Sequence, residues 1–458
     1  MTLIRANPSH PCHPWPILFL LLLFSPAAAQ TSWKAGVAKV AITPDAPVWM
    51  AGYASRTRPS EGKVQDLYAK ALALDDGRGG RVVLLTSDLI GFSGALAEAI
   101  GARVEKQFRL PRARLVLSAS HTHTGPVTRD YLRGSYELDA RQAAAVADYN
   151  RRLEDQIVAV IGRALGDLRP ARLDFGRGET HFGVNRREFT GQGVRIGVNR
   201  DGPVDPDVPV LRVASPRGEL RAVVFGYACH NTTLTGEFYE FSGDYAGFAQ
   251  ERLEAAHPGA TAMYVMGCGA DINPQPRSQL ELARDHGAAL AAAVGGVLGG
   301  ALAPVRGPLR ADFERVALPF AAPPARAEFE ARLTEANAFR RRHAERMLAR
   351  LDRDGKLISE YSYPIQVVRF GGDLTLVALA GEVVVDYVLR LKRELGAGGL
   401  WVAAYCNDVF AYVPSARVLK EGGYEAAESM IYYDLPGPFA PAVEELIVGR
   451  VRALAGKK

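Results

Sequence analysis

Short apolar runs alternate with amphipathic stretches along this chain of 458 residues. Mostly apolar runs bounded by Gly, Pro or Asp predict strands at 34–43 and 113–120, and the Asp-Gly pair at 76–77 predicts a hairpin between two further strands. Apolar residues spaced three and four positions apart predict helices at 94–108 and 140–168. The first third of the chain therefore mixes strands and helices.

The same alternation continues toward the C-terminus. Residues 243–257 predict a helix with a Ser-Gly-Asp start, and residues 325–352 predict one long charged helix. His343 lies in that charged helix, within RRRHAER, where we expect a solvated face. The alternation favours an α/β fold, with mixed β-sheets flanked by helices and with active-site residues where strands end.

The first 29 residues are typical of an export signal. Arg5 is their only formal charge, the apolar core at 16–25 is too short to span a bilayer, and the alanines at 27–29 favour cleavage before Gln30. We therefore expect a secreted or periplasmic protein in which residues 1–29 are removed and residues 30–458 form a single domain. An uncleaved anchor is the alternative interpretation.

Charge and cysteine content exclude some classes of partner and scaffold. Loss of Arg5 with the signal lowers the formal net charge from +5 to +4, and no Lys/Arg block with interleaved aromatics occurs, which excludes a nucleic-acid-binding surface. A transient contact with a membrane surface stays open, and no obligate protein partner is evident. Three cysteines remain, Cys229, Cys268 and Cys406, so a disulfide framework is excluded, although a single pair is not.

Histidines stand where two of the predicted strands end. His121 and His123 follow an apolar run and precede Gly-Pro, and His230 ends a second apolar run. Residues i and i+2 of a strand point to the same side, about 6.5–7 Å apart, so we expect His121 and His123 to face the same way. These residues alone leave a metal site open, because zinc requires three or four protein ligands.

Carboxylates also follow apolar runs. Glu382 comes after LTLVALAG and Asp271 after MYVMGCGA. Carboxylates in such places bind metals, pair with bases or cap helices, because an unpaired charge is costly to bury. Both side chains are therefore candidates for a functional site.

Several of these segments together resemble the neutral, non-lysosomal ceramidases. The segments are SASHTHTGP, ACHNTTLTGEFYEFSGDYAGFAQ, GADINP, LAGE and YCNDVFAYVPSARVLKEGGYEA, and they occur in the family's order. The glycine-rich segment AGYASRTRPSEGKVQDLYAKALALDDG, at 51–77, is similar as well. The resemblance runs from about residue 35 to 430 and covers the family's catalytic domain.

The resemblance implies one zinc ion per chain and a role for each matching residue. His121, His230, Glu382 and Tyr412 match the family's zinc ligands. His123, Arg186 and Tyr424 match catalytic residues that face the substrate, and Asp271 and Asn273 match a substrate-binding segment. In this arrangement zinc activates water and polarises an amide carbonyl, Arg186 and Tyr424 stabilise the oxyanion, and His123 holds the water or protonates the leaving amine.

The chain also departs from the family pattern. Asn273 stands where the family has a serine that contacts substrate, and the family's C-terminal β-sandwich domain is not expected in residues 30–458. The sequence predicts an exported zinc amidase that hydrolyses an N-acyl linkage, with ceramide, cleaved to a sphingoid base and a fatty acid, as the type substrate. Two alternatives stay open: a zinc hydrolase of the same fold that acts on another amide or ester, and a non-catalytic exported binding protein.

Overall fold

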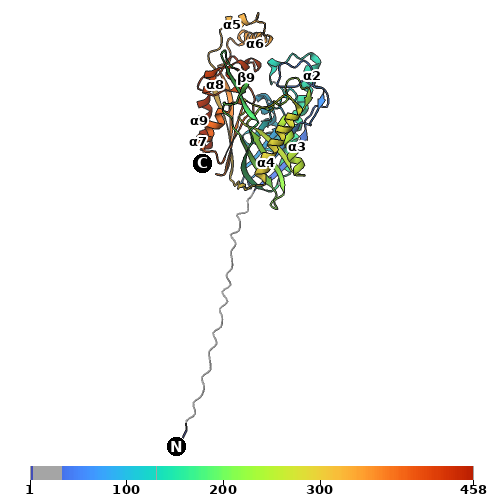
Figure 1. Ribbon diagram of the computed structural model, residues 1–458, viewed down its shortest axis with the longest axis vertical. Coiled ribbons are helices and arrows are strands. Elements are labelled where there is room, and N and C mark those ends of the chain that lie inside the picture. The colour runs from blue at the N-terminus through green and yellow to red at the C-terminus, as the bar shows by residue number, and fades with distance from the viewer. Residues whose placement is uncertain (1, 4–32, 130, 457–458) are drawn as a thin grey trace. The chain divides into compact units, whose positions relative to one another are not determined.

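The structure, a computed structural model, describes residues 2–3, 33–129 and 131–456 (Figure 1). The apolar core and cleavage site of the predicted signal peptide fall on residues 4–32 and lie outside the described residues. The described chain from residue 33 onward belongs to one compact unit, Ser32–Lys458. Each helix in residues 33–129 and 131–456 is too short or too polar to cross a membrane.

Three β-sheets form the body of this unit. Their strand orders are β5-β4-β3-β1-β6, β13-β11-β10-β7-β15 and β16-β17-β18-β20. The first contains β1 (Lys34–Ala41), β3 (Tyr68–Asp75), β4 (Arg81–Ser87), β5 (Leu115–Ala119) and β6 (Arg169–Pro170). The second contains β7 (Arg172–Glu179), β10 (Asp207–Ala214), β11 (Leu220–Tyr227), β13 (Thr261–Met266) and β15 (Ala303–Pro304). The third contains β16 (Leu309–Pro319), β17 (Glu360–Phe370), β18 (Leu374–Leu379) and β20 (Leu400–Ala403).

One face of each sheet packs on a shared apolar core. Leu72 of the first sheet, Val224 of the second and Trp401 of the third belong to this one cluster of buried side chains. Burying one face of three sheets against each other removes a large apolar area from water, which is the main force that holds them together.

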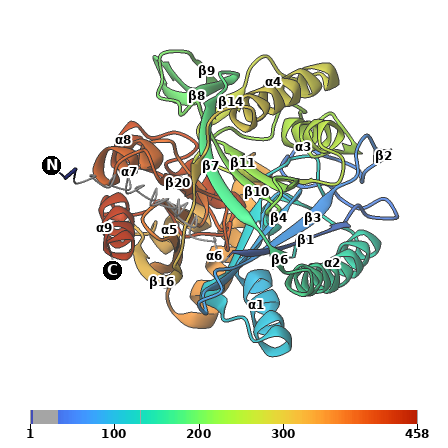
Figure 2. The ribbon, with the colours of Figure 1, turned by 90° about the horizontal axis from the view of Figure 1, so that it is seen from below.

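Helices cover the outer faces of the sheets, as Figure 2 shows. The helices α1 (Gly94–Phe108) and α2 (Ala140–Gly166) lie on the first sheet. The second sheet carries α3 (Asp244–Ala256) and α4 (Leu280–Leu298), and the third carries α7 (Asp386–Leu395) and α9 (Val443–Ala455). The α/β fold class predicted from the sequence is confirmed.

Shorter elements complete the described chain. Small sheets pair β2 (Gly62–Lys63) with β12 (Glu240–Phe241), β8 (Gly183–Thr190) with β9 (Gly193–Asn199) and β14 (Ile272–Pro274), and β19 (Glu382–Val383) with β21 (Tyr412–Val413). The remaining helices are α5 (Arg326–Arg332), α6 (Ala338–Asp354), α8 (Ala416–Glu421), η1 (Arg112–Arg114), η2 (Arg133–Ser135) and η3 (Glu428–Tyr432).

Each large sheet contains one parallel pair of strands. The pairs are β4–β5, β11–β13 and β18–β20, and the other pairings within these sheets are antiparallel. Parallel strands end on the same side of a sheet, so the loops that follow them collect there. The loops after β5, β11 and β18 carry the histidines and the glutamate that the sequence singled out.

The helices at 94–108 and 140–168 and the hairpin at 76–77 are confirmed, but the single charged helix at 325–352 is wrong. The chain breaks between α5 and α6, where Asn337 caps α6. His343 is buried, and its Nε2 lies 2.7 Å from the carbonyl oxygen of Leu435. The sequence analysis overlooked a small apolar cluster among the many Arg and Glu residues. Phe329 and Met347 belong to this cluster, which gives α6 a buried face.

The three cysteines of the described chain are buried free thiols. Burial raises the pKa of the Cys406 thiol to about 12 and raises the pKa values of Cys229 and Cys268 well above the usual value. A thiol reacts as its thiolate, so these three groups should be inert in the folded protein. We predict that Ellman's reagent labels none of them in the native chain of residues 30–458 and all three after guanidinium denaturation. Fast labelling of the native protein, or fewer than three thiols after denaturation, would contradict this prediction.

Candidate metal centre and pocket

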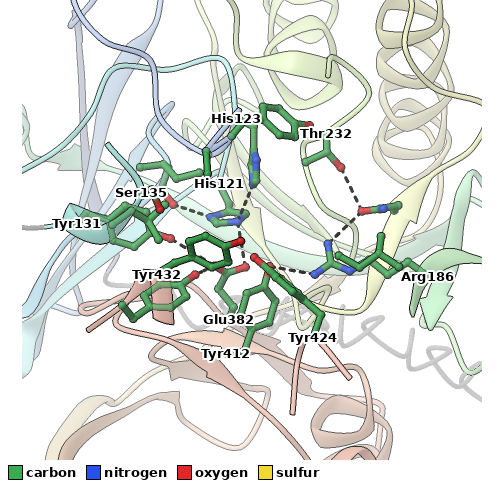
Figure 3. A pocket seen from close by; sticks show the side chains of 18 of the residues that line it. His121, His123, Tyr131, Ser135, Arg186, Thr232, Glu382, Tyr412, Tyr424 and Tyr432 are labelled. Atoms are coloured by element: carbon green, nitrogen blue, oxygen red, sulfur yellow. Dashed lines mark hydrogen bonds and ion pairs between the residues drawn. The ribbon is translucent and has the colours of Figure 1, made fainter. Parts of the chain in front are cut away.

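Four side chains that are far apart in the sequence bring their polar tips together. The Nε2 atoms of His121 and His230 lie 3.1 Å and 3.2 Å from Oε2 of Glu382. The hydroxyl oxygen of Tyr412 lies 3.5 Å from Nε2 of His230. Figure 3 shows His121, Glu382 and Tyr412 converging from different elements. The structure thus brings together all four residues that the resemblance implied as ligands.

The local backbone explains how His121 reaches this point. Strand β5 ends at Ala119, and His121 adopts the left-handed conformation with a φ of 60°. The sequence analysis expected His121 and His123 to face the same way because they share one face of a strand. That reason is wrong, because both residues lie beyond the end of the strand. The two rings nevertheless meet, with their Nε2 atoms 3.1 Å apart.

Glu382 and Tyr412 are neighbours because the two short strands that carry them pair. Glu382 is the register partner of Tyr412 in the parallel pair β19–β21. Gly381 precedes Glu382 with a φ of +75°, and a Cβ there would lie 2.7 Å from a Val413 methyl group. This glycine is therefore required for the close approach of the two strands.

Backbone carbonyls fix the tautomer of two histidines. Nδ1 of His121 lies 2.6 Å from the carbonyl oxygen of Ile90, and Nδ1 of His230 lies 2.7 Å from that of Gly269. A carbonyl oxygen only accepts, so each Nδ1 carries a proton, and in the neutral ring each Nε2 then presents a lone pair. Burial, followed by the charge of Arg186, lowers the pKa of His230 to about 4 and keeps its ring neutral.

The second oxygen of Glu382 is held by two tyrosines. Tyr131 donates to Oε1 at 3.3 Å, and Tyr433 donates to the same atom. Burial raises the pKa of Glu382, but the contacts with His121 and His230 more than offset this and hold the pKa well below its usual range. The sequence analysis missed both tyrosines. Only the cluster of tyrosines at 424–433 offered a signal for Tyr433.

The chemistry of this cluster suits a divalent cation. When both rings are neutral, the Nε2 atoms of His121 and His230 are acceptors, and each lies within hydrogen-bond distance of Oε2 of Glu382, which is also an acceptor. A cation placed between them would turn this repulsion into coordination. His121, His123 and His230 also form a group whose ring nitrogens lie within 4.8 Å of one another. The residues therefore fit a metal ion, and whether His123 is a ligand stays open.

Arg186 contacts the predicted ligands and is itself held in place by hydrogen bonds. It donates to the hydroxyl of Tyr412 at 3.0 Å, to Oδ1 of Asn273 at 3.3 Å and to Oε1 of Glu425 at 2.8 Å. Glu425 also accepts from the neighbouring Arg187 at 2.6 Å. All of these side chains are buried. The sequence analysis predicted Arg186 but missed Glu425, which is held by residues more than 200 positions away.

A cavity of about 250 Å³ opens beside the cluster. His123, Arg186, Asn273 and Tyr424 line it, together with His121, Glu382 and Tyr412. Burial raises the pKa of Tyr424, so its hydroxyl stays protonated and can donate a hydrogen bond. The expected substrate-facing residues therefore share one pocket with the cluster.

His123 packs tightly under a glycine that the sequence analysis did not single out. Gly52 has a φ of +96°, and a Cβ there would lie 2.5 Å from the His123 ring. Burial and the neighbouring His121 and His230 lower the pKa of His123 well below its usual value, and its buried Nδ1 has no hydrogen-bond partner. The ring is therefore neutral and is placed by its contacts.

Asp271 is placed differently from the other expected site residues. It lies outside the residues that line the pocket, is fully buried, and accepts hydrogen bonds from the Val385 backbone at 2.9 Å and the Asn185 side chain at 3.2 Å. Burial raises its pKa to about 7. Its contacts tie β8 to the start of α7, so the geometry favours a positioning role over the expected substrate contact.

The sequence of the chain is similar to that of one known protein family. The sequence profile of the family described as "Neutral/alkaline non-lysosomal ceramidase, N-terminal" matches residues 33–279, which is more than half of the chain. The chain belongs to this family. The resemblance noted in the sequence is thereby confirmed.

Individual family members are distant relatives. The neutral ceramidase of Pseudomonas aeruginosa is 28% identical over 246 residues, which cover 51% of this chain and 36% of that protein. The neutral ceramidase of Mycobacterium tuberculosis is 26% identical over 228 residues, covering 46% of this chain and 34% of the relative. The matched region thus spans only about a third of the length of these relatives.

Solved structures share the fold. A crystal structure of neutral ceramidase from Pseudomonas aeruginosa superposes with a TM-score of 0.69 at 22% identity, covering 93% of this chain and 74% of the other. A structure described as "Ceramidase complexed with C2" gives a TM-score of 0.71 at 20% identity, covering 93% and 75%. At this identity the likeness establishes the arrangement of sheets and helices alone.

We predict that Glu425→Gln lowers the free energy of unfolding by about 3 kcal/mol, because two buried arginines lose their shared counter-charge. Urea denaturation measures the change. Glu188→Gln, on the same strand as both arginines, is the control, since Glu188 pairs with Arg195 in an exposed position and should leave stability unchanged. Equal stability of the two variants would show that Glu425 does not hold the arginines.

Proposed function

We propose that this protein is a zinc-dependent amidase that hydrolyses an N-acyl linkage, with ceramide as its type substrate. Membership of the ceramidase family supports the reaction class. The observation that carries the proposal is the convergence of His121, His230, Glu382 and Tyr412 on one small region beside a cavity.

The spacing of these tips is compatible with one small divalent cation such as zinc. Ligand atoms about 2.0–2.1 Å from a tetrahedral zinc ion lie about 3.3–3.4 Å from each other. The separations that involve Glu382 and His230 are 3.1, 3.2 and 3.5 Å, close to this edge length. Two imidazole nitrogens and two oxygens are also a donor set that zinc accepts. We expect one zinc ion per chain.

When bound, zinc supplies a Lewis acid and lowers the pKa of water at the site. The protein's own residues then stabilise the charge that develops on the amide oxygen. Arg186 is held rigidly by Glu425, and Tyr424 keeps a proton to donate, so both can hydrogen-bond to an oxyanion without moving far. His123, neutral and facing the same cavity, is suited to accept a proton from water and pass it to the leaving amine.

A second candidate function is a zinc hydrolase of the same fold that acts on another amide or ester. Asn273 favours it, because this residue replaces a serine that the resemblance assigns to substrate contact. Its Oδ1 accepts from Arg186 at 3.3 Å and from the Thr232 hydroxyl at 3.2 Å, at the wall of the cavity. The larger carboxamide changes both the shape and the hydrogen-bonding groups of the pocket.

Metal analysis tests the centre itself. We predict about one zinc per chain in the purified protein and loss of at least nine-tenths of it in His230→Ala, together with loss of hydrolytic activity. His181→Ala is the matched control, because that histidine is exposed and should leave zinc content unchanged. Elemental analysis measures both variants. Zinc-free wild-type protein, or full occupancy in His230→Ala, would overturn the assignment.

A substrate panel tests the reaction. We predict release of fatty acid from ceramide or another N-acyl lipid, and a gain of about tenfold in kcat/KM for ceramide in Asn273→Ser, because one pocket group changes transition-state binding by about this much. Simple esters and N-acyl amino acids complete the panel. Zinc-loaded protein that cleaves only non-lipid substrates would favour the second candidate, and zinc-loaded protein that cleaves none would favour a binding protein.

A further inference from the structure

Arg277 is a cation on the wall of the pocket that uses few of its hydrogen-bond donors. It lines the cavity beside the candidate metal centre and is partly buried. Its Nη2 donates to the hydroxyl oxygen of Tyr53 at 3.1 Å, which is the one hydrogen bond of this guanidinium to the part of the chain that the structure describes. Its Nε is buried and has no partner among those residues. Four of the five N–H donors of an arginine are therefore not used within the described chain.

The charge of Arg277 has no acid partner in the pocket. Of the two arginines among the described lining residues, Arg186 pairs with Glu425, whereas Arg277 makes no ion pair with any described residue. Glu382 is the one carboxylate among those lining residues, and it is held between two histidines. The pocket wall therefore carries a positive charge at Arg277 that no contacting carboxylate of the described chain balances.

A nearby carboxylate, Asp244, is committed to the backbone. Its charge interacts with that of Arg277, but the two side chains form no ion pair in the described chain. Its Oδ2 accepts from the amide nitrogen of Leu234 at 2.9 Å and its Oδ1 from that of Tyr245 at 2.6 Å, and it is fully buried. The guanidinium of Arg277 is therefore available to an anion that enters the cavity.

The backbone on both sides of Arg277 is held in place. Nε2 of His286 lies 2.7 Å from the carbonyl oxygen of Pro276, and the amide nitrogen of Ser278 donates to the carbonyl oxygen of Thr233 at 2.7 Å. Ser278 has a φ of 87°, a left-handed conformation that is uncommon for residues other than glycine. Such conformations persist only where the surrounding structure enforces them. Arg277 is therefore presented from a fixed backbone.

Tyr53 places Arg277 on the His123 side of the cavity. The ring of Tyr53 packs edge-on against the ring of His123, with centroids 4.9 Å apart, and its hydroxyl oxygen accepts from Arg277. The same hydroxyl donates to the carbonyl oxygen of Leu234 at 2.9 Å, which fixes the ring. In the proposed reaction His123 passes a proton to the leaving amine. The amine half of the substrate therefore lies toward Arg277.

We propose that Arg277 binds an anionic group, a carboxylate or a phosphate, on the amine half of the substrate, so that the pocket prefers acidic N-acyl amines, such as N-acyl amino acids, over neutral ones. The proposal rests on the proposed function, because it assumes that the pocket cleaves an N-acyl linkage. The planar fork of a guanidinium matches the oxygens of both anions. Asn273 lines the same cavity, so the short segment 273–277 sets both its shape and its charge.

Steady-state kinetics of the full, zinc-loaded chain on matched substrates tests the proposal. N-lauroylglycine and N-lauroyl-2-aminoethyl phosphate carry the anion, and N-lauroylethanolamine has a neutral hydroxyl in a similar place. We expect kcat/KM for the better anionic substrate to exceed that for the neutral substrate by about 30-fold, the size typical of a hydrogen bond between charged groups. Faster cleavage of the glycine compound assigns a carboxylate to the site, and faster cleavage of the phosphate compound assigns a phosphate.

Variants of Arg277 connect this preference to the guanidinium. Arg277→Gln should reduce the preference to about threefold or less, and Arg277→Lys, which keeps the charge without the fork, should retain part of it. The matched control is Arg284→Gln, which removes an exposed arginine of α4 that pairs with Glu281 and should keep the full preference.

Retention of zinc in each variant shows that it is folded. Equal kcat/KM for anionic and neutral substrates in the wild type, or an unchanged preference in Arg277→Gln, overturns the anion site, while cleavage of these substrates keeps the proposed function. Calorimetric titration with the same three compounds measures binding without hydrolysis. Tighter binding of an anionic compound that is lost in Arg277→Gln, without hydrolysis of any N-acyl compound, would leave the anion site standing and remove the proposed function.

Discussion

The candidate metal centre depends on hydrogen-bonding groups from distant parts of the chain that converge on one small region. The carbonyl oxygens of Ile90 and Gly269 take the Nδ1 protons of His121 and His230, which turns both Nε2 lone pairs toward Glu382. Buried acceptors that face each other are unfavourable in a medium of low dielectric constant. A cation at their centre would remove that cost, so the arrangement of these groups favours metal binding at this site.

The arrangement of sheets follows from the need to bring these groups together. Each of the three sheets contributes one parallel pair, and parallel strands end on the same side, so a shared apolar core aims three sets of loops at one region. Local backbone conformations complete the placement of these groups. His121 adopts a left-handed backbone, and Tyr405 and Asn407 do so as well, in the loop before Tyr412. Each such residue costs on the order of 1 kcal/mol, which the surrounding packing offsets.

The sequence predicts features that depend on local pattern, but it does not predict contacts between residues far apart in the chain. The periodicity at 94–108 and the Asp-Gly turn at 76–77 are local signals, and the structure has the corresponding helix and hairpin. His230 and Glu382 were found because polar residues that end apolar runs are uncommon. Tyr131, Tyr433 and Glu425 were missed because their partners lie elsewhere in the chain. Asp271 was expected to contact substrate because of the family resemblance, and its hydrogen bond from the Val385 backbone has no local signal.

Strand β8 carries residues with three different placements: one lines the pocket, two bond to Glu425, and others lie on the exposed surface. Neighbouring residues of a regular strand point to opposite faces, yet Arg186 and Arg187 both bond to Glu425. The pairing of β8 with β9 shifts register between Asn185 and Arg187, as at a β-bulge. A bulge re-aims side chains, and here it lets two adjacent arginines share one carboxylate. Beyond it the strand resumes its regular pairing, so Phe189 is carried outward while Arg186 stays in the pocket. The orientation of the exposed hairpin is thus coupled to the position of the arginine beside the candidate metal centre.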